Sequence, residues 1–137
     1  MTLTDAGPLI AIIDADEPDH AACVHALEDL SPPLTTTWPA FTEAMYLLAR
    51  AGGLRAQRAL WSLFLSERLV VAELSRSALE RSARLMEQYA DLPMDLADAT
   101  LVGLADERGD PSIFTLDRDF LVYRFRGRGR FRITPGT

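Results

Sequence analysis

The chain has 137 residues, of which 48% are hydrophobic and 25% are charged, a composition typical of globular proteins and not of disordered ones. Its length predicts one domain, covering residues 1–137. It has no apolar stretch of the roughly 20 residues that cross a bilayer, no secretory pattern at its N-terminus, and one cysteine, which excludes an internal disulfide. We therefore expect a cytoplasmic protein without a membrane partner.

The charge of the chain is unevenly distributed. The formal net charge of −6 argues against a protein that coats nucleic acid. Five arginines nevertheless fall within residues 124–132, so the rest of the chain carries −11 (−6 minus 5). They alternate with apolar residues and glycines, which predicts a hairpin turning at residues 127–129 with its arginines on one face. That face could follow a phosphate backbone, pair with an acidic partner or be an ordinary solvated surface; the candidates for phosphate contact are Arg124, Arg126, Arg128 and Arg130.

Short apolar strands alternate with helical patterns in the N-terminal half. Residues 2–4 read as a strand, and residues 9–13 fit either a brief buried helix or a second strand. A helix is expected over residues 20–30 and a strand over residues 34–38. Two helices, residues 39–52 and 54–67, are separated by a glycine pair. The apolar side of the second, Leu60, Leu63 and Phe64, is compatible with either core or an interface.

The same alternation continues to the C-terminus. Residues 69–72 read as a strand, and residues 75–89 and 95–108 as helices, the second ended by Gly109. Strands are expected at residues 113–116 and 131–133. Strands and helices in alternation predict an α/β fold with a mostly parallel sheet.

Four acidic residues lie where one rim of such a sheet would gather them. Asp5 and Asp117 follow predicted strands, while Glu43 and Asp98 lie in the first turns of helices. Ligands of parallel sheets bind beyond the carboxyl ends of the strands. Four carboxylates together repel one another unless a cation lies among them, and Mg²⁺ or Mn²⁺ prefers such oxygens. The pattern therefore predicts a metal-dependent phosphodiester nuclease.

Neighbouring polar residues have competing interpretations. Asp95 suits a helix N-cap, whereas Asp98 shares the apolar face of its helix and needs a partner there. Strand alternation directs Thr115 to the same side as Asp117, and Asp119 could instead cap the short segment that follows it. We rank Asp95, Thr115 and Asp119 as secondary site candidates.

A denser acidic cluster at residues 14–19 has a simpler explanation. Asp14, Asp16, Glu17 and Asp19 fall in a polar turn before a helix. They lack the glycine and the terminal glutamate of a calcium loop. We interpret the cluster as a solvated helix start.

Four motifs in order resemble the PIN-domain ribonucleases, in particular the toxins of VapBC-type toxin–antitoxin pairs. The motifs are Asp5-Ala-Gly-Pro-Leu-Ile-Ala, the segment from Thr36 to Leu48 around Glu43, Leu96-Ala-Asp98-Ala-Thr-Leu-Val, and Thr115-Leu-Asp117-Arg-Asp119-Phe. The resemblance implies a three-layer α/β/α fold and a Mg²⁺- or Mn²⁺-dependent endoribonuclease. It assigns Asp5, Glu43, Asp98 and Asp117 to the acidic quartet of that family.

The resemblance also implies a cognate antitoxin as partner and a homodimer. Within the quartet, Asp5 and Asp98 are expected to hold the metal, with Glu43 and Asp117 completing its shell directly or through water. One departure is Ala6, because many family members carry a hydroxyl residue after the first aspartate. Two other functions remain open: a catalytically idle protein-binding module, and a phosphatase or DNA nuclease that uses the same acids.

Overall fold

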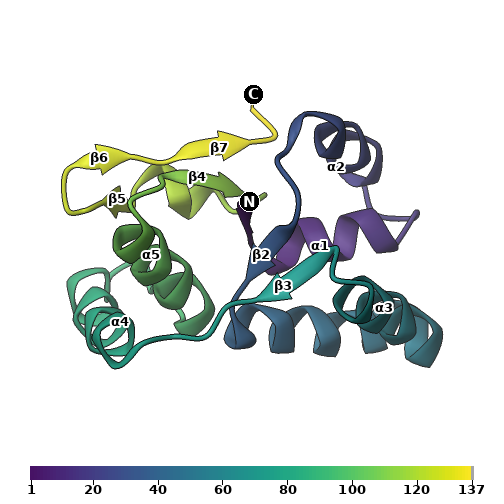
Figure 1. Ribbon diagram of the computed structural model, residues 1–137, viewed down its shortest axis with the longest axis horizontal. Helices are drawn as coiled ribbons and strands as arrows, with labels where there is room; N and C mark the ends of the chain where they lie inside the picture. Colours follow the sequence, from purple (N-terminus) through teal and green to yellow (C-terminus); the bar gives the residue numbers. More distant parts are fainter. Residues whose placement is uncertain (137) are drawn as a thin grey trace.

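A five-stranded parallel sheet forms the centre of the molecule, whose computed structural model describes residues 1–136 (Figure 1). The strands lie in the order β3 (Leu69–Val71), β2 (Leu34–Thr36), β1 (Thr2–Thr4), β4 (Ser112–Phe114) and β7 (Arg132–Thr134), and all four neighbouring pairs are parallel. The order places β1, which carries Asp5 at its end, in the middle of the sheet.

Helices cover both faces of this sheet and bury two apolar clusters (Figure 1). On one side lie α1 (Ala6–Ile13), α2 (His20–Ala26), the 3-10 turn η1 (Leu27–Asp29) and α3 (Trp38–Leu65). On the other side lie α4 (Arg76–Gln88) and α5 (Leu96–Arg108). Register partners share a face: Leu3 and Ile113 join the α4–α5 cluster, and Leu34 and Leu69 join the α1–α3 cluster. The predicted three-layer α/β/α fold with a parallel sheet is confirmed.

The structure defines where three of the predicted segments begin, end or break. Residues 9–13 form part of helix α1, which begins directly after Asp5. Strand β2 stops at Thr36, and Trp38 opens α3 with Pro39 in its first turn, so the prediction of strand through residue 38 is wrong by two residues. The predicted helix break falls at Gly53 (φ 63°, ψ −155°), a conformation open to glycine, and it kinks α3 into two segments.

The arginine-rich segment forms the expected antiparallel hairpin, β5 (Arg124–Phe125) and β6 (Gly129–Arg130). It follows the 3-10 turn η2 (Arg118–Leu121) and precedes β7. Arg124 lies opposite Arg130 and Phe125 opposite Gly129, while Arg126 and Arg128 belong to the turn. The prediction that the arginines share one face therefore applies to the strand pair Arg124 and Arg130.

The apolar residues of α3 divide between the core and the surface. Leu60 is fully buried, and Leu63 and Phe64 pack against the same cluster, so this set belongs to the core. Other large apolar side chains of α3 are exposed: Trp38, Tyr46, Leu47, Leu54, Trp61 and Leu65. No helix in residues 1–136 combines the length and apolar character needed to cross a membrane.

Candidate metal centre

Asp5 joins the end of β1 to the start of α1. Its extended backbone makes it the N-cap of that helix, and its Oδ1 accepts a hydrogen bond from the Ala6 amide at 2.8 Å. Its Oδ2 accepts a second from the Thr115 hydroxyl at 2.8 Å. The residue is 6% exposed, so both bonds hold a carboxylate that water barely reaches.

Thr115 and Asp117 follow β4, the strand beside β1. The buried Thr115 hydroxyl donates to Asp5 and also accepts a hydrogen bond from the Asp117 amide at 3.0 Å. Asp117 Oδ1 in turn accepts from the Asp119 amide at 2.9 Å and opens the turn η2. Asp117 is thus the cap of that turn, and Thr115 links the backbone of one acid to the side chain of another.

Asp98 enters from the helix layer opposite α1. The Asp95 side chain caps α5 by accepting a hydrogen bond from the Asp98 amide at 2.8 Å. Asp98 itself is 5% exposed and lies one turn further on, where its Oδ2 accepts a hydrogen bond from the Tyr123 hydroxyl at 2.9 Å. The cap and the tyrosine fix this carboxylate at the N-terminal end of α5.

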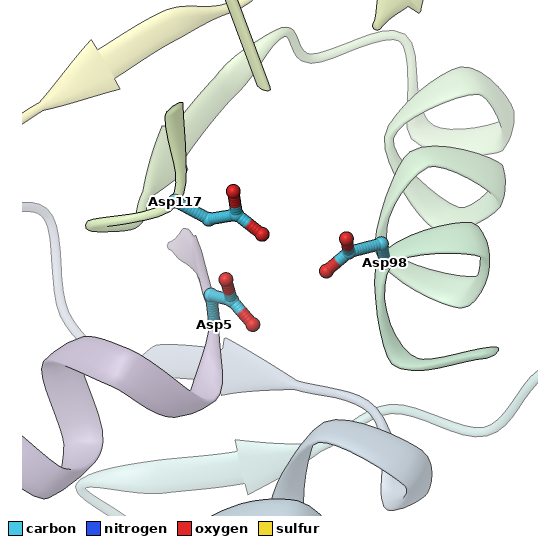
Figure 2. A group of neighbouring side chains, drawn as sticks. All are labelled: Asp5, Asp98 and Asp117. Carbon is cyan, nitrogen blue, oxygen red and sulfur yellow. The ribbon is translucent and has the colours of Figure 1, made fainter. Parts of the chain in front are cut away.

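The three aspartates point toward one another across the carboxyl edge of the sheet (Figure 2). One carboxylate oxygen from each of Asp5, Asp98 and Asp117 lies within 4.8 Å of the other two. They line a pocket of about 280 Å³, and Glu43 and Asp95 complete its acidic wall. Within residues 1–136, no arginine or histidine forms an ion pair with any of these five acids.

Burial and the charges of nearby acids make Asp5, Glu43 and Asp98 hard to ionise. Burial, with the charges of Asp5 and Asp95, raises the pKa of Asp98 to about 8, although the Tyr123 hydrogen bond opposes the shift. Burial also raises the pKa of Asp5, against the hydrogen bonds from Thr115 and Ala6. The pKa of Glu43 is raised by burial and by the charges of Asp95, Asp5 and Asp117. Such a group of acids lowers its energy by gaining a cation.

The donor set fits a hard divalent cation. Carboxylate oxygens are the ligands that Mg²⁺ and Mn²⁺ prefer, and the pocket offers three of them without a thiolate or imidazole. Asp5, Asp98 and Asp117 could hold an ion directly, and Glu43 is on the wall of the same pocket. An acidic cluster able to hold a metal ion is therefore present.

The secondary candidates divide between the pocket and its surroundings. Asp95 lines the pocket while capping α5, and Thr115 supports both Asp5 and Asp117. Asp119 contributes its amide to Asp117 and is not part of the pocket wall. Sequence reasoning missed Tyr123, because only the packing of residues 123 and 98 reveals that the tyrosine is a donor to the site.

The arginine candidates lie on the hairpin, away from the pocket wall. The Arg124 guanidinium donates to the carbonyls of Leu121, Val122 and Tyr123. Arg126 donates to Asp106 through its amide and its guanidinium. Arg128 and Arg130 are exposed, and within residues 1–136 no ion pair or side-chain hydrogen bond engages either of them.

The sequence of the chain matches the PIN domain family over residues 2–126. The chain belongs to the PIN domain family. A curated relative, ribonuclease VapC26 of Mycobacterium tuberculosis, is 33% identical over 134 residues, which cover 97% of this chain and 99% of the relative. The sequence resemblance to PIN-domain toxins of the VapC type is confirmed.

Solved structures agree on the PIN fold. The sarcin–ricin loop cleaving toxin VapC20 of M. tuberculosis superposes with a TM-score of 0.80 at 19% identity, covering 87% of this chain and 92% of the toxin. A toxin–antitoxin complex from Klebsiella pneumoniae gives a TM-score of 0.63 at 20% identity, covering 88% of this chain and 90% of the matched chain. At these identities the two structures support the architecture of the PIN domain alone.

Proposed function

We propose that this PIN domain is a Mg²⁺- or Mn²⁺-dependent endoribonuclease and the toxin of a toxin–antitoxin pair. The observation that carries the proposal is the convergence of Asp5, Asp98 and Asp117, none of which has an ion-pair partner within residues 1–136. Its substrate class rests on similarity to a ribonuclease over nearly the whole chain.

The residues of the pocket divide the work of phosphodiester hydrolysis. Asp5, Asp98 and Asp117 would hold the ion, and Glu43 would complete its shell directly or through water. Thr115 and the Ala6 amide keep the Asp5 carboxylate aimed into the pocket. A bound divalent cation would supply Lewis-acid activation of water and of the scissile phosphate. Because the charge of Asp5 raises the pKa of both Asp98 and Glu43, the protons of these three acids titrate together, and none of the three is assigned as the general base.

The decisive experiment compares RNA cleavage by the wild type, Asp5→Asn and Asp98→Asn in Mg²⁺, in Mn²⁺ and in chelator. Both variants keep the shape of the side chain and remove a charged ligand. We expect cleavage by the wild type only with a metal, and a loss of at least about 100-fold in each variant, since even outer-shell changes cost 10- to 100-fold. Retained cleavage by either folded variant would contradict the assignment of Asp5 and Asp98 as metal ligands of a nuclease.

A matched control is Asp16→Asn, which makes the same chemical change in the exposed acidic turn before α2. This variant should cleave like the wild type. Parallel assays on single-stranded DNA and on a small phosphate ester separate the ribonuclease from a DNA nuclease or phosphatase. Absence of both metal binding and cleavage would favour an idle binding module.

The partner and the assembly follow from the same proposal. A cognate antitoxin would block the acidic pocket, and an arginine of that partner would match its uncompensated carboxylates. The similarity to ribonuclease VapC26, a protein of the toxin type that the sequence resembles, supports such a partner. We also propose a homodimer, for which the exposed apolar side chains of α3 offer a surface, and light scattering measures its mass.

A further inference from the structure

We propose that Tyr123 is a positioning residue that holds the Asp98 carboxylate in its metal-binding orientation. The inference rests on the proposed metal-dependent function of the pocket. Its hydroxyl donates to Asp98 Oδ2 at 2.9 Å, and within residues 1–136 it is the one side-chain donor to that carboxylate. The hydrogen bond fixes the orientation of a carboxylate that places one of its oxygens within 4.8 Å of oxygens of Asp5 and Asp117.

The ring of Tyr123 is held by aromatic neighbours. It is fully buried, with edge-on contacts to Phe120 at 5.0 Å and to Tyr89 at 5.1 Å between ring centroids. Phe120 in turn contacts Phe131 at 5.6 Å. A ring packed on several sides has little freedom to rotate, so its hydroxyl is presented to Asp98 from a fixed position.

The backbone beside Tyr123 is equally restrained. The Arg124 guanidinium donates to the carbonyls of Leu121 and Val122 at 3.0 Å and to that of Tyr123 at 3.3 Å. The amide of Tyr123 donates to the Asp119 carbonyl at 3.0 Å. These bonds fasten Tyr123 to the turn η2, whose N-cap is Asp117. One short segment therefore supplies a candidate ligand, Asp117, and the residue that orients another, Asp98.

A fixed donor matters here because Asp98 faces other acids. Without the hydroxyl, its carboxylate would be free to rotate away from Asp5 and Asp117, toward whatever solvent or backbone donors it could find. Groups that orient metal ligands through hydrogen bonds commonly raise the affinity for the metal 10- to 100-fold. The same reasoning assigns Thr115 to Asp5, but Thr115 contacts two candidate ligands at once and is the less selective probe.

The test is Mn²⁺ binding to Tyr123→Phe, measured by calorimetry with the full chain. The substitution keeps the ring and its packing and removes only the hydroxyl. We expect the affinity for Mn²⁺ to fall roughly 10- to 100-fold. Wild-type affinity in a folded Tyr123→Phe would overturn the proposal and leave the proposed nuclease intact. If the wild type itself binds no Mn²⁺, the metal site and the positioning role fail together.

Tyr89→Phe is the matched control. It removes a hydroxyl from the same aromatic cluster, where Tyr89 accepts a hydrogen bond from the Arg124 amide at 3.0 Å instead of contacting a carboxylate. The control should lose stability without losing Mn²⁺ affinity. Equal losses of affinity in both variants would mean that the cluster acts only as scaffold, which contradicts a specific role for Tyr123.

A measurement on the wild type covers the case in which Tyr123→Phe does not fold. The chain has three tyrosines, so the ring carbons that bear the hydroxyls give three resonances after selective ¹³C labelling. Tyr46→Phe and Tyr89→Phe assign two of them, and Tyr123 is the third. Titration with Mg²⁺ should shift the Tyr123 resonance, with a midpoint that matches the Mg²⁺ affinity of the wild type measured by calorimetry. An unmoved resonance at saturation would overturn the proposal.

Discussion

Asp5 receives a hydroxyl contact from a part of the chain that its own sequence motif does not contain. Ala6 lacks the hydroxyl that the family resemblance leads one to expect after the first aspartate. Thr115, 110 residues away, donates to Asp5 at 2.8 Å, and the Ala6 amide donates to the other oxygen. The Asp5 carboxylate is thus oriented at both oxygens, although residue 6 has no hydroxyl.

The raised pKa of Asp98 predicts how the metal-free protein responds to pH. A folded-state pKa of about 8, above the ordinary 3.8, means that the folded protein favours the protonated acid. Its contribution to stability is complete below about pH 4 and is lost as the pH rises through about 8. The neutral amide of Asp98→Asn escapes this loss.

We therefore expect Asp98→Asn to melt several degrees above the wild type at pH 8.5 in chelator, and the gap to shrink at pH 5.5. Thermal melts across this range measure the difference. A gap that does not change with pH would contradict the burial of Asp98 as a charged group. Saturating Mn²⁺ should reverse the order, because only the wild type would gain stability from the ion.

Among the elements, α5 combines a structural acid with a candidate ligand one turn apart. Asp95 caps the helix by accepting a hydrogen bond from the Asp98 amide. The first turn of the same helix places Asp98 at the pocket. The pairing explains why two aspartates three residues apart have different tasks. The cap fixes the helix end, and the more deeply buried second acid faces the other carboxylates.

A pair of substitutions at residue 95 separates the cap from the charge. Asp95→Ala should cost about 1 kcal/mol of the free energy of unfolding, whereas Asp95→Ser retains a capping oxygen and should lose only a few tenths. Both variants remove the same negative charge from the pocket wall. Denaturant unfolding in chelator measures the two values, and equal destabilisation would show that the hydrogen bond to Asp98 contributes little.

At the scale of the whole molecule, the pocket and the arginine hairpin lie along the same helix. Arg126 in the hairpin binds Asp106, eight residues beyond Asp98 on α5, which is about 12 Å along a helix axis. An RNA strand that crosses the pocket could reach the hairpin over that distance. Arg128 and Arg130 are exposed and have no side-chain partner within residues 1–136, so we propose that they contact its phosphates.

The double variant Arg128→Gln/Arg130→Gln should therefore weaken RNA binding and lower its dependence on salt. If both arginines contact phosphates, the slope of log affinity against log salt should fall by about 1.4, at about 0.7 for each single-strand contact. Fluorescence anisotropy with a labelled RNA and the cleavage-deficient Asp98→Asn background measures the slope. The control Arg55→Gln/Arg58→Gln removes the same charge from α3. An equal fall of the slope in this control would mean that the net charge of the protein, and not contact by the hairpin arginines, sets the salt dependence.

The sequence by itself determined the alternation of strands and helices, because each element carries its own apolar period and its own caps. It also indicated which acids need a compensating cation or hydrogen-bond donor, since Asp5 follows a strand and Asp98 lies on an apolar helix face. These are local properties, and the strand and helix boundaries it predicted lie mostly within a few residues of those observed.

Only the tertiary structure decided which side chains meet. Asp5, Asp98 and Asp117 converge because β1, α5 and the segment after β4 pack at one edge of the sheet, although 112 residues separate the first acid from the last. The donors to these acids, Thr115 and Tyr123, come from packing between segments 110 and 25 residues apart, respectively. Sequence periodicity carries no information about such distances. The four acids and Thr115 were therefore foreseeable as site candidates, whereas the contact of Thr115 with Asp5 and the role of Tyr123 were not.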